Sequence, residues 1–227
     1  MQESATLAEV LAELAASPDH VFHSSLSLYI IAENRPRPEC PNWVEVGCLN
    51  ISGAEGMMVY LSPLDALLDA RARNCDGGRY HVHPFEAIDP RPYISKHDHW
   101  LTLYLVYGFA ARGKHLLVSE RGHVQALALG THFQITPDMY DHFHLAFPDS
   151  LVDELNAVHH TAGIYDYGDI LSELTGCSAH DLDRQAEEAT ERIGEPVSGD
   201  SENVTHCALY DPIEQRWRFA AFADVTT

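Results

Sequence analysis

Three strand-like segments joined by very short turns constrain the fold of this chain most strongly. Residues 100–109, 114–119 and 123–129 are rich in leucine, aromatic and β-branched side chains, and Gly113 and Gly122 lie in the turns between them. Consecutive strands joined by so few residues must pair antiparallel. The sequence therefore predicts an antiparallel meander in the middle of the chain.

The other expected elements come in runs rather than in strict alternation of strand and helix. Alternating or continuous apolar residues predict further strands at 26–31, 43–51, 57–61, 79–83 and 206–223, the last of these being a hairpin. Apolar residues spaced by three and four predict helices at 7–16, after Ser62, and in several segments between 136 and 194. This order predicts an α+β fold: a mostly antiparallel sheet flanked by helices, with a helical C-terminal third and a terminal β-hairpin.

The pattern changes near residue 135, and this change divides the chain. We expect residues 1–135 to form an α+β sheet domain, and residues 136–227 to form an acidic helical segment and closing hairpin. Both parts are expected to pack as one unit. The chain has 227 residues, of which 45% are hydrophobic and 21% are charged, as in ordinary globular proteins.

The clearest local signal is the start of the helix after Ser62. Ser62 suits the N-cap, Pro63 suits the first helical position, and Asp65 occupies the third position of a capping box. Ser178 and Asp181 repeat the same pattern before the last expected helix.

The charge of the chain is strongly negative and unevenly distributed. Its 34 acidic and 14 basic residues give a net charge of -20, and residues 149–203 hold 14 acidic residues against two basic ones. Such a field repels nucleic acids and anionic membranes and favours cationic partners. We therefore expect neither nucleic-acid nor membrane binding, although mimicry of a nucleic acid by the acidic helices stays open.

The cysteines and the N-terminus favour a cytoplasmic protein. Five cysteines at irregular spacings form no disulfide framework or zinc motif of a known kind. Residues 1–16 lack the basic start and apolar run of a secretory signal, and no apolar stretch reaches the length of a membrane span.

A histidine cluster offers one possible site for metal chemistry. His81 and His83 share one face of an expected strand, and Glu86 follows three residues later. Residues 78–86 resemble the first metal motif of cupins, but the spacings differ and no second histidine motif follows. The alternative to a binding protein is thus a cupin-like or hydrolytic enzyme using Zn, Fe or Mn; otherwise these histidines simply face solvent.

No other catalytic pattern is present in the sequence. His97, Asp98 and His99 fit an ordinary polar turn better than a metal site, and no nucleophile elbow, phosphate loop or dinucleotide-binding motif occurs. Residues 169–193 resemble a helix-turn-helix in spacing only, because the second helix is too acidic to approach phosphates. No catalytic residue is therefore predicted.

Two loops combine aromatic rings with carboxylates in the way that suits a protein interface. Aromatic side chains are frequent hot spots, and carboxylates pair with Lys or Arg on a cationic partner. The expected partner-binding residues are Tyr93, Asp98, Trp100, Tyr165, Asp166, Tyr167 and Asp169. The alternative is that the tyrosines only cap the core.

The order of elements resembles the N-terminal domain of the SseB-like proteins over about residues 7–130. The matching elements are the helix at 7–16, the strand around Tyr29, and the passage from Met58 to Leu67, in which a hydrophobic strand passes through Ser62 into a leucine-bearing helix. Residues 89–99 and the helices after 136 depart from this pattern. The resemblance implies a non-enzymatic bacterial binding protein without a cofactor. Together with the acidic excess and the missing catalytic motifs, it favours an immunity protein that binds and neutralises a cognate toxin with a cationic surface.

Overall fold

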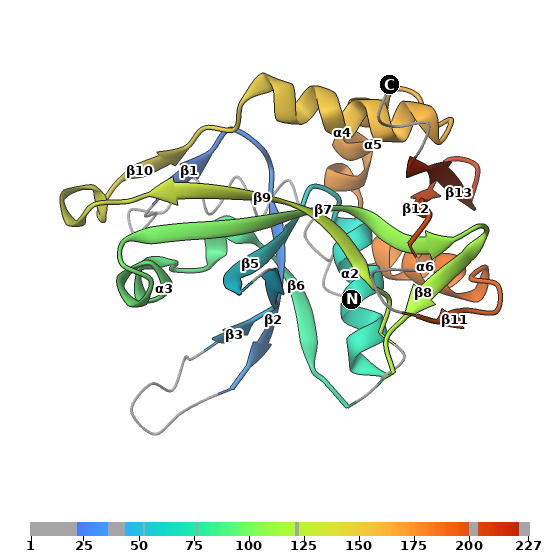
Figure 1. Cartoon of the computed structure of the whole chain (residues 1–227), viewed down its shortest axis with the longest axis horizontal. Helices are drawn as coiled ribbons and strands as arrows, with labels where there is room; N and C mark the ends of the chain where they lie inside the picture. Colours follow the sequence, from blue (N-terminus) through green and yellow to red (C-terminus); the bar gives the residue numbers. More distant parts are fainter. Residues whose placement is uncertain are drawn as a thin grey trace.

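The computed structural model describes residues 22–35, 44–51, 53–75, 77–120, 123–199 and 204–222. Over these residues the chain has an α+β fold, in which helices pack on a large, curled sheet (Figure 1). The predicted α+β class is confirmed, whereas the sheet is mixed and the last third of the chain holds strands as well as helices. The helix expected at 7–16 lies outside the described residues, as does Cys40.

The chain forms short strands around one long strand. The strands are β1 (Phe22–Ser24), β2 (Tyr29–Asn34), β3 (Val44–Val46), β4 (Cys48–Ile51), β5 (Ala54–Tyr60), β6 (Tyr80–Pro84), β7 (Trp100–Arg112), β8 (His115–Val118), β9 (Ala126–Gln134), β10 (Phe143–Leu145), β11 (Val197–Ser198), β12 (His206–Asp211) and β13 (Arg216–Ala221). The helices are α2 (Pro63–Asn74), η1 (Phe85–Ala87), α3 (Arg91–Lys96), η2 (Pro137–Met139), α4 (Asp149–Thr161), α5 (Tyr167–Gly176) and α6 (Ala179–Glu191).

The sheet is mixed rather than purely antiparallel, and β7 is its hub. β7 pairs antiparallel with β8, β9 and β12 but parallel with β5. A parallel pair needs a long crossover, which residues 61–99 supply with α2, β6 and α3. The expected meander differs in one respect, because β9 runs along β7 instead of pairing along β8.

Two segments differ from the sequence prediction. Residues 84–93, where the sequence predicts neither a helix nor a strand, contain η1 and the start of α3. Residues 136–147, which we expected to be helical, form instead the short turn η2 followed by β10. β10 pairs in parallel with β1, so Phe143 and Leu145 enter the core as strand residues while His144 faces solvent. The pairing partner is distant in sequence, which is why local periodicity suggested a helix.

α2 begins as its sequence predicts. The Ser62 hydroxyl accepts a hydrogen bond from the Asp65 N–H at 3.2 Å, and Pro63 occupies the first turn. Leu64 and Leu68 are buried in a cluster with residues of β7, α5, α6 and β12. α6 begins in the same way, with the Ser178 hydroxyl accepting from the Asp181 N–H at 3.2 Å.

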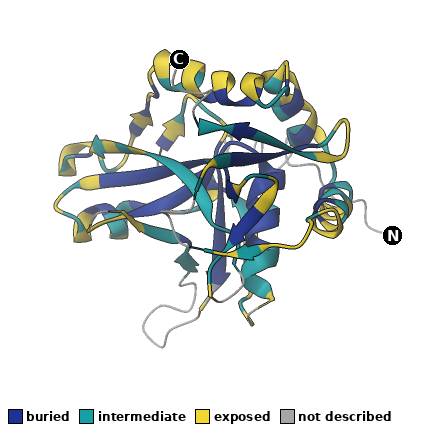
Figure 2. Ribbon diagram, turned by 45° about the vertical axis from the view of Figure 1, so that its right-hand side comes forward, coloured by how far each residue is buried: buried dark blue, intermediate teal, exposed yellow. Residues whose placement is uncertain are grey.

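The C-terminal hairpin joins the main sheet. β12 pairs antiparallel with both β13 and β7, so that Cys207 lies opposite Ala110. Gly108, at a register shift in β7, permits this close approach, since a Cβ there would lie 2.6 Å from the Cys207 Sγ. Figure 2 shows the buried residues concentrated on the central strands and on the inner sides of the helices. No helix in the described part of the chain has both the length and the apolar character of a membrane span.

Candidate functional site

The seven expected partner-binding residues fall at two separate places. Tyr93 lies on α3, and Asp98 and Trp100 lie where α3 joins β7, whereas the other four residues lie at the junction of α4 and α5. Figure 1 shows α3 and the α4–α5 junction in opposite halves of the molecule. The structure therefore brings each group together but does not join the two into one surface.

Of the α3 group, Tyr93 lines a wide groove, and internal contacts hold its side chain in place. The Tyr93 hydroxyl donates to the Glu55 carbonyl oxygen at 2.7 Å, and its ring stacks on His97 with centroids 3.9 Å apart. The groove has a volume of about 710 Å³, and Glu55, Asp89 and Lys96 lie in its wall. Asp98 has a positive φ of 52°, as the polar-turn interpretation of this segment requires.

Three residues of the α4–α5 group, Tyr165, Asp166 and Tyr167, line an open hollow. Tyr165 is 60% exposed, and the edge of the His160 ring meets it at a centroid distance of 4.8 Å. Asp166, with φ 58° and ψ 39°, is in the left-handed conformation that turns the chain into α5. The hollow has a volume of about 540 Å³ and is lined also by Asp153 of α4.

The carboxylates of α4 and α5 differ from those of α6 in their partners. On α6, Asp181, Asp183 and Glu188 pair with Arg184, Arg71 and Arg192. Six exposed carboxylates on α4, α5 and their junction form no ion pair with any described residue: Asp149, Asp153, Glu154, Asp166, Asp169 and Glu173. We call these six residues the α4–α5 acidic face. Within the acidic stretch at 149–203, these are carboxylates whose charge no described Lys or Arg neutralises.

Tyr167 faces inward rather than outward with Tyr165. Its ring is partly buried and stacks on His159, with centroids 3.4 Å apart, and burial raises its pKa well above the ordinary value. The His159 Nδ1–H donates to the Leu155 carbonyl oxygen at 2.8 Å, so its Nε2 carries no proton in the neutral ring. Burial lowers the pKa of His159 to about 4, which keeps the ring neutral at physiological pH.

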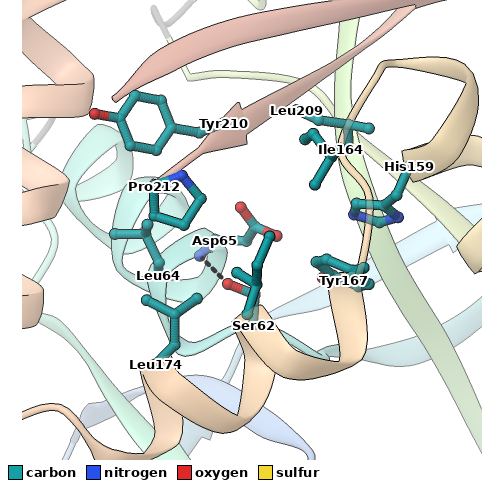
Figure 3. Close-up of a pocket in the computed structure, with 11 residues that line it drawn as sticks. Ser62, Leu64, Asp65, His159, Ile164, Tyr167, Leu174, Leu209, Tyr210 and Pro212 are labelled. Carbon is teal, nitrogen blue, oxygen red and sulfur yellow. Dashed lines mark hydrogen bonds between the residues drawn. The ribbon is translucent and has the colours of Figure 1, made fainter. Parts of the chain in front are cut away.

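Behind Tyr167 lies a pocket that contains a buried carboxylate, Asp65. The pocket has a volume of about 10 Å³, room for about one water molecule. Its eleven lining residues come from the start of α2, from α4, from α5 with the junction before it, and from β12 with the turn after it (Figure 3). Asp65 is 8% exposed, and Figure 3 shows its carboxylate turned into the middle of the pocket. Desolvation raises its pKa from 3.8 to about 7.

Asp65 is unusual among the buried carboxylates that the structure describes. These are Glu33, Asp65, Asp69 and Asp211. Three of them pair with an arginine, at 3.0 Å for Glu33–Arg35, 2.9 Å for Asp69–Arg73 and 3.0 Å for Asp211–Arg218. The Asp65 carboxylate has no hydrogen-bond or ion-pair partner in the described part of the chain, and none of the pocket's lining residues is Lys or Arg.

The histidine cluster lies on β6, the strand that follows the end of α2. The pocket, by contrast, is lined by residues at the start of α2. His81 is exposed and His83 half-buried on the same strand, and burial, with His81 nearby, lowers the pKa of His83. Glu86 follows in η1. Within the described ranges no three His, Cys, Asp or Glu side chains are grouped so as to hold a metal ion, and Zn, Fe or Mn binding stays a prediction.

Sequence reasoning assigned Asp65 to a helix cap and gave His159 no role. The capping pattern was a correct signal for the helix start, but only the Asp65 N–H takes part in the cap. Its carboxylate becomes notable only when α4, α5 and β12 close around it. No sequence signal marks that closure.

Comparisons with known proteins supply no relative. No protein-family model matches the chain, no curated protein matches it, and no solved structure matches its fold.

Proposed function

We propose that this chain is an acidic bacterial binding protein of the immunity type, which holds and neutralises a cognate toxin in the cytoplasm. The observation that carries the proposal is the α4–α5 acidic face, whose six exposed carboxylates form no ion pair with any described residue. Two of them, Asp153 and Asp166, line the same hollow as the exposed ring of Tyr165. Unpaired surface carboxylates keep their full charge available to a cationic partner.

The hollow beside Tyr165 gives this face a shape as well as a charge. Tyr165 offers aromatic area for a central contact, and Asp153 and Asp166 line the same hollow of about 540 Å³. Aromatic anchors inside a charged rim are a common arrangement in tight interfaces. The toxin's matching surface would present Lys or Arg around a shallow projection.

The α3 group is a second part of the proposal. Trp100 is 43% exposed beside Asp98, and Tyr93 borders the large groove. Because this group lies in the other half of the molecule, it would contact a different part of a large toxin, or none of it. The α4–α5 acidic face is therefore the surface to test first.

The test is co-expression with the product of the adjacent gene, scored by survival of the cells and by co-purification. The test variant carries three charge reversals on the acidic face: Asp153→Lys, Asp166→Lys and Asp169→Lys. The matched control carries three reversals on exposed positions at and after α6: Glu187→Lys, Glu191→Lys and Glu195→Lys. Both variants change the net charge by the same amount.

We expect the test variant to lose the complex and the protection, and the control to keep both. The affinity of the wild-type complex should also fall as salt is added, because exposed charges are screened. An unmodified chain that neither co-purifies nor protects would refute the proposal. Equal loss in both variants would show that net charge, rather than this face, carries any effect.

A further inference from the structure

The groove beside Tyr93 lies where two hairpins of the sheet separate. β2 pairs with β3 and β4 pairs with β5, but the described sheet contains no pairing between β3 and β4 (Figure 1). Both inner strands begin at Gly47. Its N–H donates to the Ile31 carbonyl oxygen of β2, and its carbonyl oxygen accepts from the Met58 N–H of β5, each at 2.9 Å. β3 therefore follows β2, and β4 follows β5, away from a common point.

The groove follows the edges of these two inner strands. It has a volume of about 710 Å³ and is lined by residues 44–46 of β3, by residues 48–50 of β4, and by residues of β5 and α3. Neighbouring side chains of a strand point to opposite faces. Consecutive residues therefore line one groove together when the groove runs along the edge of their strand rather than over one face.

The edges that border the groove carry free backbone groups. Alternate residues of an antiparallel ladder direct their N–H and C=O groups away from the partner strand. Because Gly47 bonds to β2 and β5, the alternate positions on either side of it direct these groups away from β2 and β5: Val44, Val46, Cys48 and Asn50. No described strand pairs with them there. An extended peptide segment presents donors and acceptors in the matching order.

The side chains of the groove add a requirement of charge. Glu55 of β5 and Lys96 of α3 line it, and neither forms an ion pair with a described residue. Burial raises the pKa of the Cys48 thiol to about 11, with Glu55 raising it further and Lys96 lowering it, so both charges act on the interior of the groove. The other carboxylates in the lining pair with arginines: Glu45 with Arg35 and Asp89 with Arg91.

We propose that this groove binds an extended segment of another protein, which enters as a strand between β3 and β4. Its backbone pairs with the two free edges, and its apolar side chains pack on Val46, Met57 and Ile88. One basic side chain of the segment meets Glu55, and one acidic side chain meets Lys96. The site is separate from the α4–α5 acidic face, and the proposal does not depend on the partner being a toxin.

The chain itself is a poor occupant of the groove. A second copy carries the same net charge of -20 and is repelled by the first. Residues 1–21 contain four carboxylates and no Lys or Arg, so they offer Glu55 no partner. A segment of another protein with both charges fits better.

The probes are blocked pentapeptides in which three valines stand between a lysine and a glutamate. Both orders of the two charged residues are used, because a strand can run in either direction. The peptides are neutral overall, so the net charge of the chain does not attract them. Binding to the full chain is followed by NMR at about 0.15 M salt, from the amide shifts of residues 44–51.

N-methylated forms of the better-binding peptide test the backbone pairing. One form is methylated at its second and fourth residues, and the other at its first, third and fifth residues. Each form removes the N–H donors from one edge of the peptide and keeps its charge and side chains. Since a strand between β3 and β4 uses both edges, each form should bind about tenfold more weakly or worse.

Charge reversals on the protein test the side-chain contacts. Glu55→Lys and Lys96→Glu should each lower the affinity by about threefold or more, because attraction is replaced by repulsion. The matched controls are Glu154→Lys and Lys114→Glu, which make the same changes of net charge at exposed positions outside the groove. Both controls should bind like the wild type.

We expect one peptide per chain, with shifts concentrated in β3 and β4. No shift with either peptide, or undiminished binding of both methylated forms, overturns the proposal. Weakening by one methylated form alone would place the strand on a single edge and contradict insertion between two. A dimer that the peptides dissociate would assign the edges to a second copy instead. The toxin experiment is distinguishable from these outcomes, because its reversals lie on the α4–α5 acidic face.

Discussion

Replacing Asp65 by Asn should stabilise the protein at neutral and alkaline pH. The pKa of Asp65 is raised from 3.8 to about 7, so the folded state holds a proton that the unfolded state has lost over that window. The free energy of unfolding of the wild type therefore falls as pH rises from about 4 to about 7 and then levels off. At about 1.4 kcal/mol per pH unit, the full effect is on the order of 4 kcal/mol, which the neutral Asn side chain avoids.

Urea unfolding of both proteins at pH 4.5, 6, 7 and 8 measures this difference. Subtracting the wild type from the variant at each pH removes other titrations, including that of His159, whose lowered pKa acts in the opposite direction. The matched control is Asp69→Asn, which removes a fully buried carboxylate bonded to Arg73 and Tyr60 and should destabilise the protein by about 3 kcal/mol or more. A gain from Asp65→Asn that is the same at pH 4.5 and pH 8 would refute the reasoning.

Three further predictions concern the hairpin and its contact with β7. Arg218→Ala leaves Asp211 buried without its arginine and should lower the free energy of unfolding by about 2 to 3 kcal/mol in urea; no change would mean that the pair is not formed. Gly108→Ala places a methyl group 2.6 Å from the Cys207 Sγ and should lower thermal stability by about 1 to 3 kcal/mol, so an unchanged melting temperature would contradict the close packing of β12 on β7. The Cys207 thiol, buried and with its pKa raised to about 12, should react with a thiol reagent only on unfolding, whereas exposed Cys75 should react at once in the folded protein; similar rates would show that β12 opens readily.

Elements with a complete local signal were predicted well. The cap at Ser62 and the apolar spacing of Leu64 and Leu68 are contained within a few residues of α2, and the turn at Gly113 fixes the antiparallel pairing of β7 and β8. Such signals need no distant partner. The α+β class follows from their order along the chain.

Elements that depend on distant partners were predicted poorly. Residues 143–145 have helix-like apolar spacing but form β10, because they pair with β1 more than a hundred residues earlier. The parallel pairing of β5 with β7 likewise depends on the crossover between them, whose path no local pattern specifies. Strand preference is set largely by such neighbours, which explains both differences.

The expected interface residues were located by composition, and composition does not distinguish exposed rings from packed ones. Tyr165 and Tyr167 are two residues apart in the same acidic motif, yet Tyr165 is exposed and Tyr167 stacks on His159. The difference arises at Asp166, whose left-handed conformation turns the chain into α5 between the two rings. A sequence pattern cannot give the direction in which each tyrosine ring points.

The capping pattern at α2 explains why Asp65 is compatible with the helix but not why it is a carboxylic acid. Ser62 caps the Asp65 N–H, a group that every residue except proline supplies, and the Asp65 side chain does not return the bond. Alanine or leucine at this position would keep the cap and avoid the burial of a charge. The start of the helix therefore requires neither the Asp65 carboxylate nor its raised pKa.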